Sequence, residues 1–288
     1  MSILLNEDTR VIIQGATGKQ GRYHMSKMLE YNVKVVGGIS PGKGGQVVLD
    51  VPIYDTIAAA AKDSKIDATM IIVPPGGVLW AAREAIDARI PLVVIITEHV
   101  PFHDALIIRR EAENAGIRIV GPNTIGVISP GRCKIGVMPG FIYSKGPVGV
   151  ISRSGTLTHE IASNLTYRGI GQSTCVCIGG DMSKTTNFID VLKLFEKDDQ
   201  TETVVMIGEI GGAGEEVAAR YIKENGYSKK VVAYIAGATA PAGKKMGHAG
   251  AIISGNFGSA DSKIKNLEAA GVKVARRMDE LLDIVGQR

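Results

Sequence analysis

The feature that most constrains this 288-residue sequence is an alternation of short Val/Ile-rich runs with longer amphipathic stretches, with glycine at many of the junctions. Such runs are typical of strands buried on both faces, and the stretches between them are long enough to form helices. A repeated strand–helix–strand order predicts an α/β fold with a parallel sheet covered on both faces. In the first half, the predicted strands are 11–14, 33–37, 68–73, 92–96 and 118–120, and the predicted helices are 23–31, 56–61, 78–89 and 105–115.

A Gly/Pro-rich passage from 121 to about 146 interrupts the alternation, which then restarts. We interpret this passage as an inter-domain connection with an edge hairpin. We therefore expect two domains, residues 1–125 and 126–288, which agrees with the length of the chain. In the second half, the predicted strands are 148–152, 172–178, 203–207, 231–235 and 272–274, and the predicted helices are 156–168, 187–197, 215–224 and 262–270.

The composition argues against several classes of protein. The net charge is only +4 and the basic residues are scattered, so we expect no nucleic-acid partner. No apolar run approaches the roughly 20 residues that span a bilayer, so we expect no membrane segment. Three cysteines without a signal peptide favour a cytoplasmic location. Cys175 and Cys177 lie on a predicted strand without a second Cys/His pair at zinc spacing, so we interpret them as buried small residues and expect no metal site.

A glycine-rich loop at 14–21 follows the first predicted strand and opens a helix. Gly15, Gly18 and Gly21 allow the backbone to approach a ligand, and the free N–H groups of the helix favour phosphate. Lys43, which lies among glycines after the next strand, is a second candidate phosphate contact. The alternatives are a structural turn and a solvated lysine. The acidic residue that an NAD site places about 20 residues downstream is missing, which disfavours a dehydrogenase.

The second half begins with a similar loop. Ser154 and Thr156 stand where a predicted strand gives way to a helix, and the N–H groups there suit either a phosphoryl group or a plain N-cap. A serine nucleophile is disfavoured in this loop, because neither Ser152 nor Ser154 lies in a G-x-S-x-G pattern.

Two further residues carry the chemistry of a nucleophile. His248 stands in a loop of glycines and alanines, and a neutral imidazole is a competent nucleophile near pH 7. Glu209 ends an apolar strand among glycines, and a carboxylate on one ring nitrogen would fix the tautomer of a nearby histidine. The alternatives are an exposed or structural histidine and a surface glutamate.

Taken together, these loops are very similar to those of the α subunit of succinyl-CoA synthetases, over essentially the whole chain. The resemblance implies a Rossmann-like CoA-binding domain followed by a flavodoxin-like parallel α/β domain that carries a phosphohistidine loop. The stretches that carry it are 14–21, 36–45, 96–98, 121–123, 152–158, 208–212 and 246–252.

The resemblance implies an acid–thiol ligase that acts in three steps. An ATP-grasp β subunit, in an αβ or α₂β₂ assembly, binds ATP or GTP with Mg²⁺. The γ-phosphoryl group moves to His248 and then to a carboxylic acid, and the thiol of coenzyme A displaces phosphate to give the thioester. The absence of a G-x-x-x-x-G-K-[ST] loop agrees with a nucleotide bound by another chain.

The resemblance also assigns roles. Glu209 would orient His248, and Ser154, Gly155 and Thr156 would hold the phosphoryl group. The residues that match coenzyme A contacts are Thr17, Gly18, Lys19, Gln20, Lys43, Ile96, Thr97 and Glu98.

Departures from the family pattern cluster around the expected acid pocket. His159 replaces a tyrosine, and Thr124 and Ile125 replace Cys-Pro after Asn123. We take these four residues as candidate substrate contacts, and an imidazolium at His159 would favour a more anionic or hydrogen-bonding acid. The expected acid is succinate, and malate, citrate or a sulfo-acid are the alternatives. A non-catalytic module that binds coenzyme A or a nucleotide is the competing function.

Overall fold

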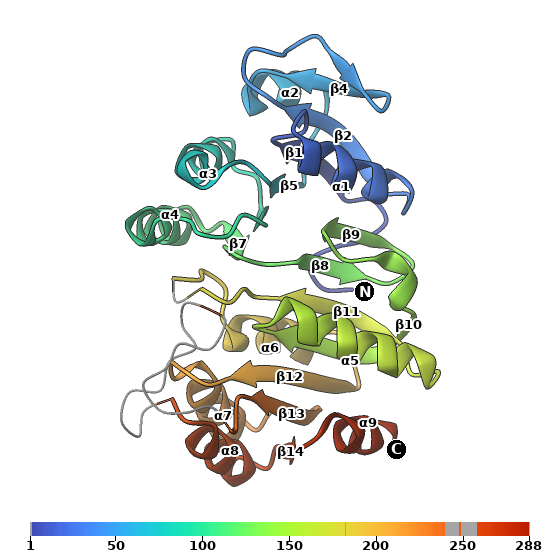
Figure 1. Cartoon of the computed structure of the whole chain (residues 1–288), viewed down its shortest axis with the longest axis vertical. Coiled ribbons are helices and arrows are strands. Elements are labelled where there is room, and N and C mark those ends of the chain that lie inside the picture. The colour runs from blue at the N-terminus through green and yellow to red at the C-terminus, as the bar shows by residue number, and fades with distance from the viewer. Residues whose placement is uncertain (1, 182, 240–247, 249–257, 288) are drawn as a thin grey trace.

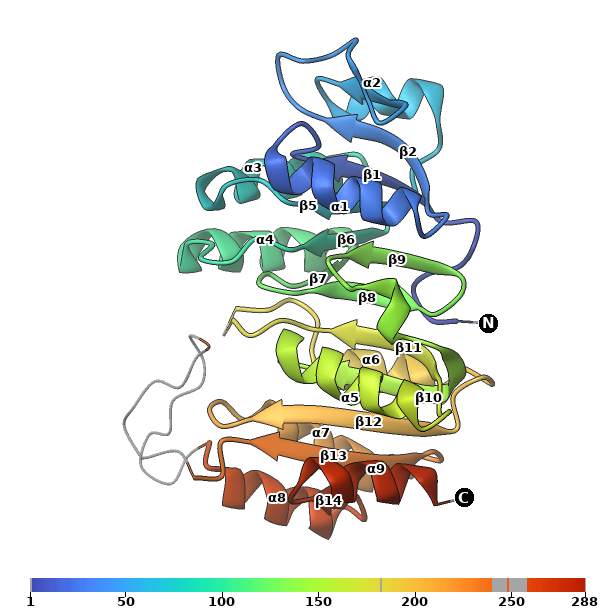
Figure 2. The same ribbon diagram turned by 45° about the vertical axis from the view of Figure 1, so that its right-hand side comes forward.

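The computed structural model describes residues 2–181, 183–239, 248 and 258–287. Two β-sheets follow one another along the long axis of the molecule, and helices cover both faces of each sheet (Figure 1). The chain builds the upper sheet first and ends beside the lower one, as the turned view in Figure 2 also shows. The predicted α/β fold is therefore confirmed.

The first sheet is parallel except for a short strand at one edge. Its strand order in the described part of the chain is β3-β4-β2-β1-β5-β6-β7, and only β3 runs antiparallel to its neighbour. Its strands are β1 (Arg10–Gln14), β2 (Lys34–Ile39), β3 (Val47–Val48), β4 (Val51–Tyr54), β5 (Ala68–Ile71), β6 (Leu92–Ile95) and β7 (Arg118–Val120).

Helices cover the two faces of this sheet unequally. Met25 and Met28 of the first helix are buried in the same apolar cluster as Val11 and Ile13, whereas the next three helices pack on the opposite face. The helices are α1 (Lys19–Leu29), α2 (Ile57–Asp63), η1 (Pro75–Gly77), α3 (Val78–Asp87) and α4 (Phe102–Ala115).

The second sheet combines a parallel core with an antiparallel hairpin. Its order over the described residues is β14-β13-β12-β10-β11-β8-β9, and β8 and β9 form the predicted edge hairpin. Its strands are β8 (Gly126–Ser129), β9 (Cys133–Gly136), β10 (Lys145–Ser152), β11 (Gln172–Cys177), β12 (Thr203–Glu209), β13 (Lys230–Ala236) and β14 (Lys273–Ala275).

The helices of the second sheet again divide between its faces. Apolar side chains of α5 and α9 are buried together on one face, and those of α6, α7 and α8 on the other. These elements are η2 (Gly140–Ile142), α5 (Gly155–Tyr167), α6 (Phe188–Glu196), α7 (Gly214–Glu224), α8 (Ala260–Ala269) and α9 (Met278–Gly286).

The strand order places several loops at one edge. β10 lies between β11 and β12 and is parallel to both, so the loops that follow Ser152, Cys177 and Glu209 leave the sheet at the same side. In open α/β sheets, ligands bind beyond these carboxyl ends. None of the helices that the structure describes is long and apolar enough to cross a membrane.

Candidate functional site

An imidazole and a carboxylate meet at the carboxyl edge of the second sheet. Glu209 is the last residue of β12, and its Oε2 lies 2.7 Å from Nδ1 of His248. The hydrogen bond to Glu209 raises the pKa of His248, against the lowering effects of burial and of Arg153. Because Nδ1 is occupied, Nε2 is the nitrogen left to react. Of the predicted phosphohistidine motif 246–252, only His248 is among the described residues.

The imidazole lies against a residue without a side chain. A Cβ atom at Gly180 would stand 2.5 Å from Cδ2 and 2.6 Å from Cγ of His248, far inside ordinary contact distance. Gly180 follows β11, so the loop after this strand forms a wall of the site. We did not predict this contact from the sequence, although a glycine pair directly after a buried strand is a signal for a close approach.

The second oxygen of Glu209 faces a buried arginine. Nη2 of Arg153 lies 3.2 Å from Oε1 of Glu209, as an ion pair whose geometry falls short of a hydrogen bond. Nη1 of Arg153 lies 3.1 Å from Oε1 of Glu215 and donates to the carbonyl of Gly211 at 2.9 Å. Burial would raise the pKa of Glu215, but Arg153 and Lys263 outweigh it and the pKa lies below its usual value.

Lys263 completes this group of charges. Its ammonium contacts Oε2 of Glu215, lies 3.0 Å from Oε2 of Glu216, and donates to the carbonyl of Gly212 at 2.9 Å. The side chains of Lys263 and Glu215 are fully buried. Arg153, Glu215 and Lys263 were not predicted as site residues, because in sequence they look like a loop cation and two residues of solvent-facing helices.

The loop after β11 brings two more charges to this edge. The negative charge of Asp181 raises the pKa of His248, as does the hydrogen bond that the imidazole donates to Glu209. Lys184 donates to the carbonyl of Asp181 at 3.3 Å, and burial lowers its pKa to about 8.

The predicted phosphoryl-binding residues form the start of α5. Ser154 is the N-cap and its Oγ accepts from the N–H of Leu157 at 3.3 Å; Gly155 and Thr156 begin the helix. They follow directly on Arg153, which reaches Glu209. Among the described residues, Ser154 and Thr156 make no hydrogen bond with His248, although the helix start lies at the same edge of the sheet.

Three of the four candidate acid contacts pack against these loops. The side-chain amide of Asn123 donates to Oδ1 of Asp181 at 3.0 Å. The hydroxyl of Thr124 donates to the carbonyl of Cys177. The side chain of Ile125 faces Gly155, where a Cβ atom would be 2.5 Å from its Cγ2.

His159 lies one turn into α5, and its ring meets Tyr143 edge-on at a centroid distance of 6.3 Å. Burial lowers the pKa of His159. The neutral imidazole is therefore favoured, in contrast to the imidazolium that we considered from the sequence. Its Nε2 is buried without a hydrogen-bond partner in the described structure.

The predicted coenzyme A contacts lie at the carboxyl edge of the first sheet. Nζ of Lys43 donates to Oγ1 of Thr17 at 3.0 Å, which joins the two glycine-rich loops. Gly15 has φ +91°, and a Cβ atom there would be 2.6 Å from the carbonyl oxygen of Ile72, so this turn requires glycine. Gly18 is the N-cap of α1 and has no side chain that could cap the helix, which leaves N–H groups of the first turn open. Lys19 and Gln20 are exposed in this first turn.

The other half of the predicted set follows β6. The hydroxyl of Thr97 donates to the carbonyl of Val73 at 2.7 Å, and the N–H of Ile96 bonds to β5. The carbonyl of Thr97 accepts from the N–H of Asn123 at 3.0 Å, which ties this loop to the second sheet. The side chain of Glu98 is exposed and lies 3.9 Å from that of His99.

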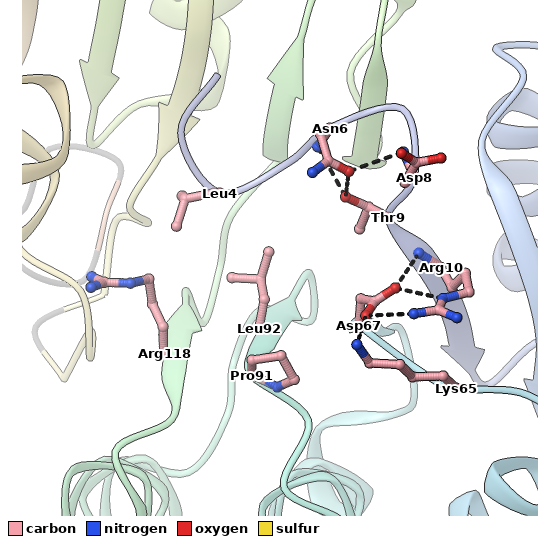
Figure 3. A pocket seen from close by; sticks show the side chains of 10 residues that line it. All are labelled: Leu4, Asn6, Asp8, Thr9, Arg10, Lys65, Asp67, Pro91, Leu92 and Arg118. Carbon is pink, nitrogen blue, oxygen red and sulfur yellow. Dashed lines mark hydrogen bonds and ion pairs between the residues drawn. The ribbon is translucent and has the colours of Figure 1, made fainter. Parts of the chain in front are cut away.

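A hollow of about 480 Å³ lies at the opposite, amino end of the first sheet (Figure 3). Three of its charged side chains pair with one another: Asp67 binds Arg10 at 2.7 Å and Lys65 at 3.6 Å. Because ligands of α/β sheets bind at carboxyl ends, we do not place the site there. The described residues hold no cluster of three or more His, Cys, Asp or Glu side chains suited to a metal ion.

Known families match both halves of the chain. Residues 6–99 match the family described as CoA binding domain, and residues 151–273 match the family described as CoA-ligase. Among solved structures, the ATP citrate lyase of Methanothrix soehngenii, in complex with citrate and coenzyme A, superposes with a TM-score of 0.91 at 25% identity. The match covers 99% of this chain and 50% of that one, so the chain spans about half the length of the lyase. The dinucleotide forming acetyl-coenzyme A synthetase 1 of Ca. Korarchaeum cryptofilum shares the fold at a TM-score of 0.78 and 21% identity, over 97% of this chain and 60% of that one.

Sequence relatives match at full length. The succinate–CoA ligase [ADP-forming] subunit alpha 2 of Archaeoglobus fulgidus is 50% identical over 287 residues, which cover 100% of this chain and 99% of the relative. The corresponding α subunit of Staphylococcus aureus is 50% identical over 281 residues, which cover 98% of this chain and 93% of the relative. This chain therefore belongs to the family of succinate–CoA ligase α subunits, and it is an acid–thiol ligase with a CoA-binding domain followed by a CoA-ligase domain.

Proposed function

We propose that this chain is the α subunit of an ADP- or GDP-forming ligase that makes succinyl-CoA reversibly from succinate, coenzyme A and a nucleoside triphosphate, with His248 as the phosphoryl carrier. The observation that carries the proposal is the 2.7 Å contact between Nδ1 of His248 and Glu209. It holds one nitrogen as a donor to a carboxylate and leaves the lone pair of Nε2 free for attack.

The reaction has three balanced displacements. Nε2 of His248 attacks the γ-phosphorus of the nucleotide, and the bond to the departing diphosphate breaks. A carboxylate oxygen of the acid then attacks the same phosphorus and releases the imidazole. Finally the thiol sulfur of coenzyme A attacks the acyl carbon, the thiol gives up its proton, and phosphate leaves. Glu209 stabilises the imidazole in the first two steps as the acceptor of its Nδ1–H.

The remaining residues have supporting roles in this proposal. Ser154 caps the helix at Leu157 and leaves the N–H groups of Gly155 and Thr156 open. These two groups would bind the phosphoryl group, since a helix N-terminus favours an anion. The loops that contain Lys43 and Thr97 would bind coenzyme A at the edge of the first sheet. Asn123, which contacts both Thr97 and Asp181, would lie between the thiol and the acid.

The proposal includes a partner. The names of the relatives describe α subunits, so we propose a β subunit of ATP-grasp fold that supplies the nucleotide and Mg²⁺, in an αβ or α₂β₂ complex. This division of labour agrees with the missing G-x-x-x-x-G-K-[ST] loop in this chain.

The phosphoryl carrier is tested by replacing the imidazole. We expect His248→Asn, co-purified with the β subunit and incubated with γ-labelled ATP or GTP, to lose all acid-labile, alkali-stable label and to bind coenzyme A as the wild type does. His103→Asn, an exposed histidine of α4, is the matched control and should label normally. Label retained by His248→Asn would identify a different nucleophile.

The acid is tested with a panel of substrates. We expect the complex to give its highest kcat/KM with succinate, measured by thioester formation against malate, citrate and a sulfo-acid. The residues that favour a different outcome are Thr124, Ile125 and His159, which depart from the family pattern. A higher kcat/KM for any of the other acids would keep the ligase chemistry and replace succinate as the substrate.

A further inference from the structure

A chain of buried charges extends from His248 into the protein. The side chains of Lys263 and Glu215 are completely buried, and those of Arg153 and Glu209 are 4% and 10% exposed. Burying charges costs free energy that their pairing offsets only with good geometry, and apolar residues of similar size often stabilise a fold as well. A buried charged chain that ends on a reactive histidine therefore suggests a role beyond stability.

Each residue of this chain of charges contacts the next one and holds it in place. Oε2 of Glu209 contacts His248, while its Oε1 faces Arg153. Glu215 then holds Glu209 twice: it binds the guanidinium of Arg153 at 3.1 Å, and it accepts the backbone N–H of Glu209 at 3.2 Å. Glu215 therefore fixes both the main chain and the cationic partner of the carboxylate that orients the imidazole.

Lys263 connects this chain to another element. It lies on α8 and binds Glu215, Glu216 and the carbonyl of Gly212, which belong to α7 and to the loop before it. The backbone of Gly211 in the same loop donates to the carbonyl of Gly258 at 2.7 Å. The start of α8 is thereby held against the loop that directly follows Glu209 in the chain.

We propose that Lys263 and Glu215 are positioning residues for His248, which act through Arg153 to hold Glu209 against Nδ1 and to balance the charge that the imidazole experiences. This inference rests on the proposed function, because it assumes that His248 reacts through Nε2. Neither residue touches the reacting atoms, so their effect must appear as a change in the state of the histidine.

The sign of that change follows from the charges around the imidazole. Besides Glu209 and the three residues of the chain, the described residues place three more charged groups around this network. Asp181 acts on His248 itself, Lys184 in the same loop acts on the residues of the chain, and Glu216 on α7 binds Lys263. Removing the positive Lys263 leaves an excess of negative charge, which raises the pKa of His248. Removing the negative charge of Glu215 leaves an excess of positive charge and lowers it.

These shifts act on the rate of phosphorylation. A protonated imidazole has no lone pair on Nε2, so the rate of phosphorylation decreases at pH values below the pKa of His248. We expect the acidic limb of the pH–rate profile to shift to higher pH by roughly one pH unit in Lys263→Met and to lower pH in Glu215→Gln. Because the geometry of Glu209 also loosens, we expect kcat at the optimum to fall about 10-fold or more, as for other groups that orient a reactive histidine.

The experiment measures the initial rate of acid-labile labelling against pH in the αβ complex, with KM for the acid and Kd for coenzyme A at one pH. Lys265→Met is the matched control, since it makes the same substitution on the exposed side of α8. Limbs that move in opposite directions, with KM and Kd within about twofold of the wild type, support the inference. Loss of folded protein alone would lower the amount of label at every pH without shifting the pH–rate profile of either variant.

The outcomes separate the two proposals. A wild-type complex without label on His248 overturns the proposed function itself. A labelled wild type whose limb stays unmoved in Lys263→Met overturns the positioning role alone. If Lys263→Met does not fold, the Glu215→Gln variant decides: a downward limb supports the role, and an unmoved limb overturns it.

Discussion

At the scale of single residues, the site depends on one short contact and on a neighbouring residue that has no side chain. The carboxylate of Glu209 and the ring of His248 approach to 2.7 Å, and the ring rests against Gly180. Glu209 ends β12 and Gly180 lies shortly after the end of β11, so the second sheet places both neighbours of the ring. The identity of the residue at position 180 is therefore as important for the geometry as the carboxylate.

We predict that Gly180→Ala slows phosphorylation of His248 by about 10- to 100-fold, the cost of a displacement of roughly 1 Å in a reacting group. The new methyl group would stand 2.5 Å from the ring, so the imidazole must move and its bond to Glu209 must lengthen. The measurement is the initial labelling rate of the αβ complex at the pH optimum.

Gly76→Ala is the control for this variant. Gly76 has no left-handed φ, and a Cβ atom there meets nothing within 4 Å, so the substitution should leave the rate unchanged. Equal rates for the two variants would mean that the ring tolerates the methyl group and that Gly180 has no role in its placement.

The sequence predicts single residues of the site better than their contacts. His248 and Glu209 are 39 positions apart, and the prediction that they meet came from the chemistry of their loops and from the family resemblance. The burial of Lys263 had a signal that the prediction did not use: α8 buries Ala260, Lys263, Ile264 and Leu267, the spacing of an apolar stripe. A lysine at such a position has to be paired inside the protein.

At the scale of elements, the Val/Ile runs predicted the central strands, whereas a helix boundary, a hairpin and a helix were predicted wrongly or missed. The predicted helix 23–31 begins earlier, at Lys19, because the glycine loop leads directly into its first turn. The β3–β4 hairpin was missed because its turn places Leu49 and Asp50 at positive φ, where Asn and Gly are the usual signals. Helix α9 was also missed, although Leu281, Leu282 and Val285 are buried against α5 and the second sheet.

At the scale of the whole molecule, hydrogen bonds link the edges of the two sheets. Thr97 follows β6 of the first sheet and accepts from the backbone of Asn123, whose side chain binds Asp181 beside Gly180 in the second. The proposed coenzyme A loops and the proposed phosphohistidine site are thus joined through residues 121–125. All the residues that we propose for the phosphorylation of His248 nevertheless belong to the second sheet and its loops, so we expect the two proposed functions to separate by mutation.

We predict that Lys43→Ala weakens coenzyme A binding about 5- to 10-fold, which corresponds to about 1 kcal/mol, while the rate of His248 labelling stays unchanged. The lysine now donates to Thr17, and its charge would face the phosphates of the ligand at the edge of the first sheet. Calorimetry with coenzyme A and labelling of the same αβ complex give the two numbers. Lys62→Ala, which changes an exposed lysine of helix α2 on the first sheet, is the control. A variant that lost labelling together with coenzyme A affinity would show that the sheets act as one unit, because the first sheet would then be needed to form the phosphorylated histidine.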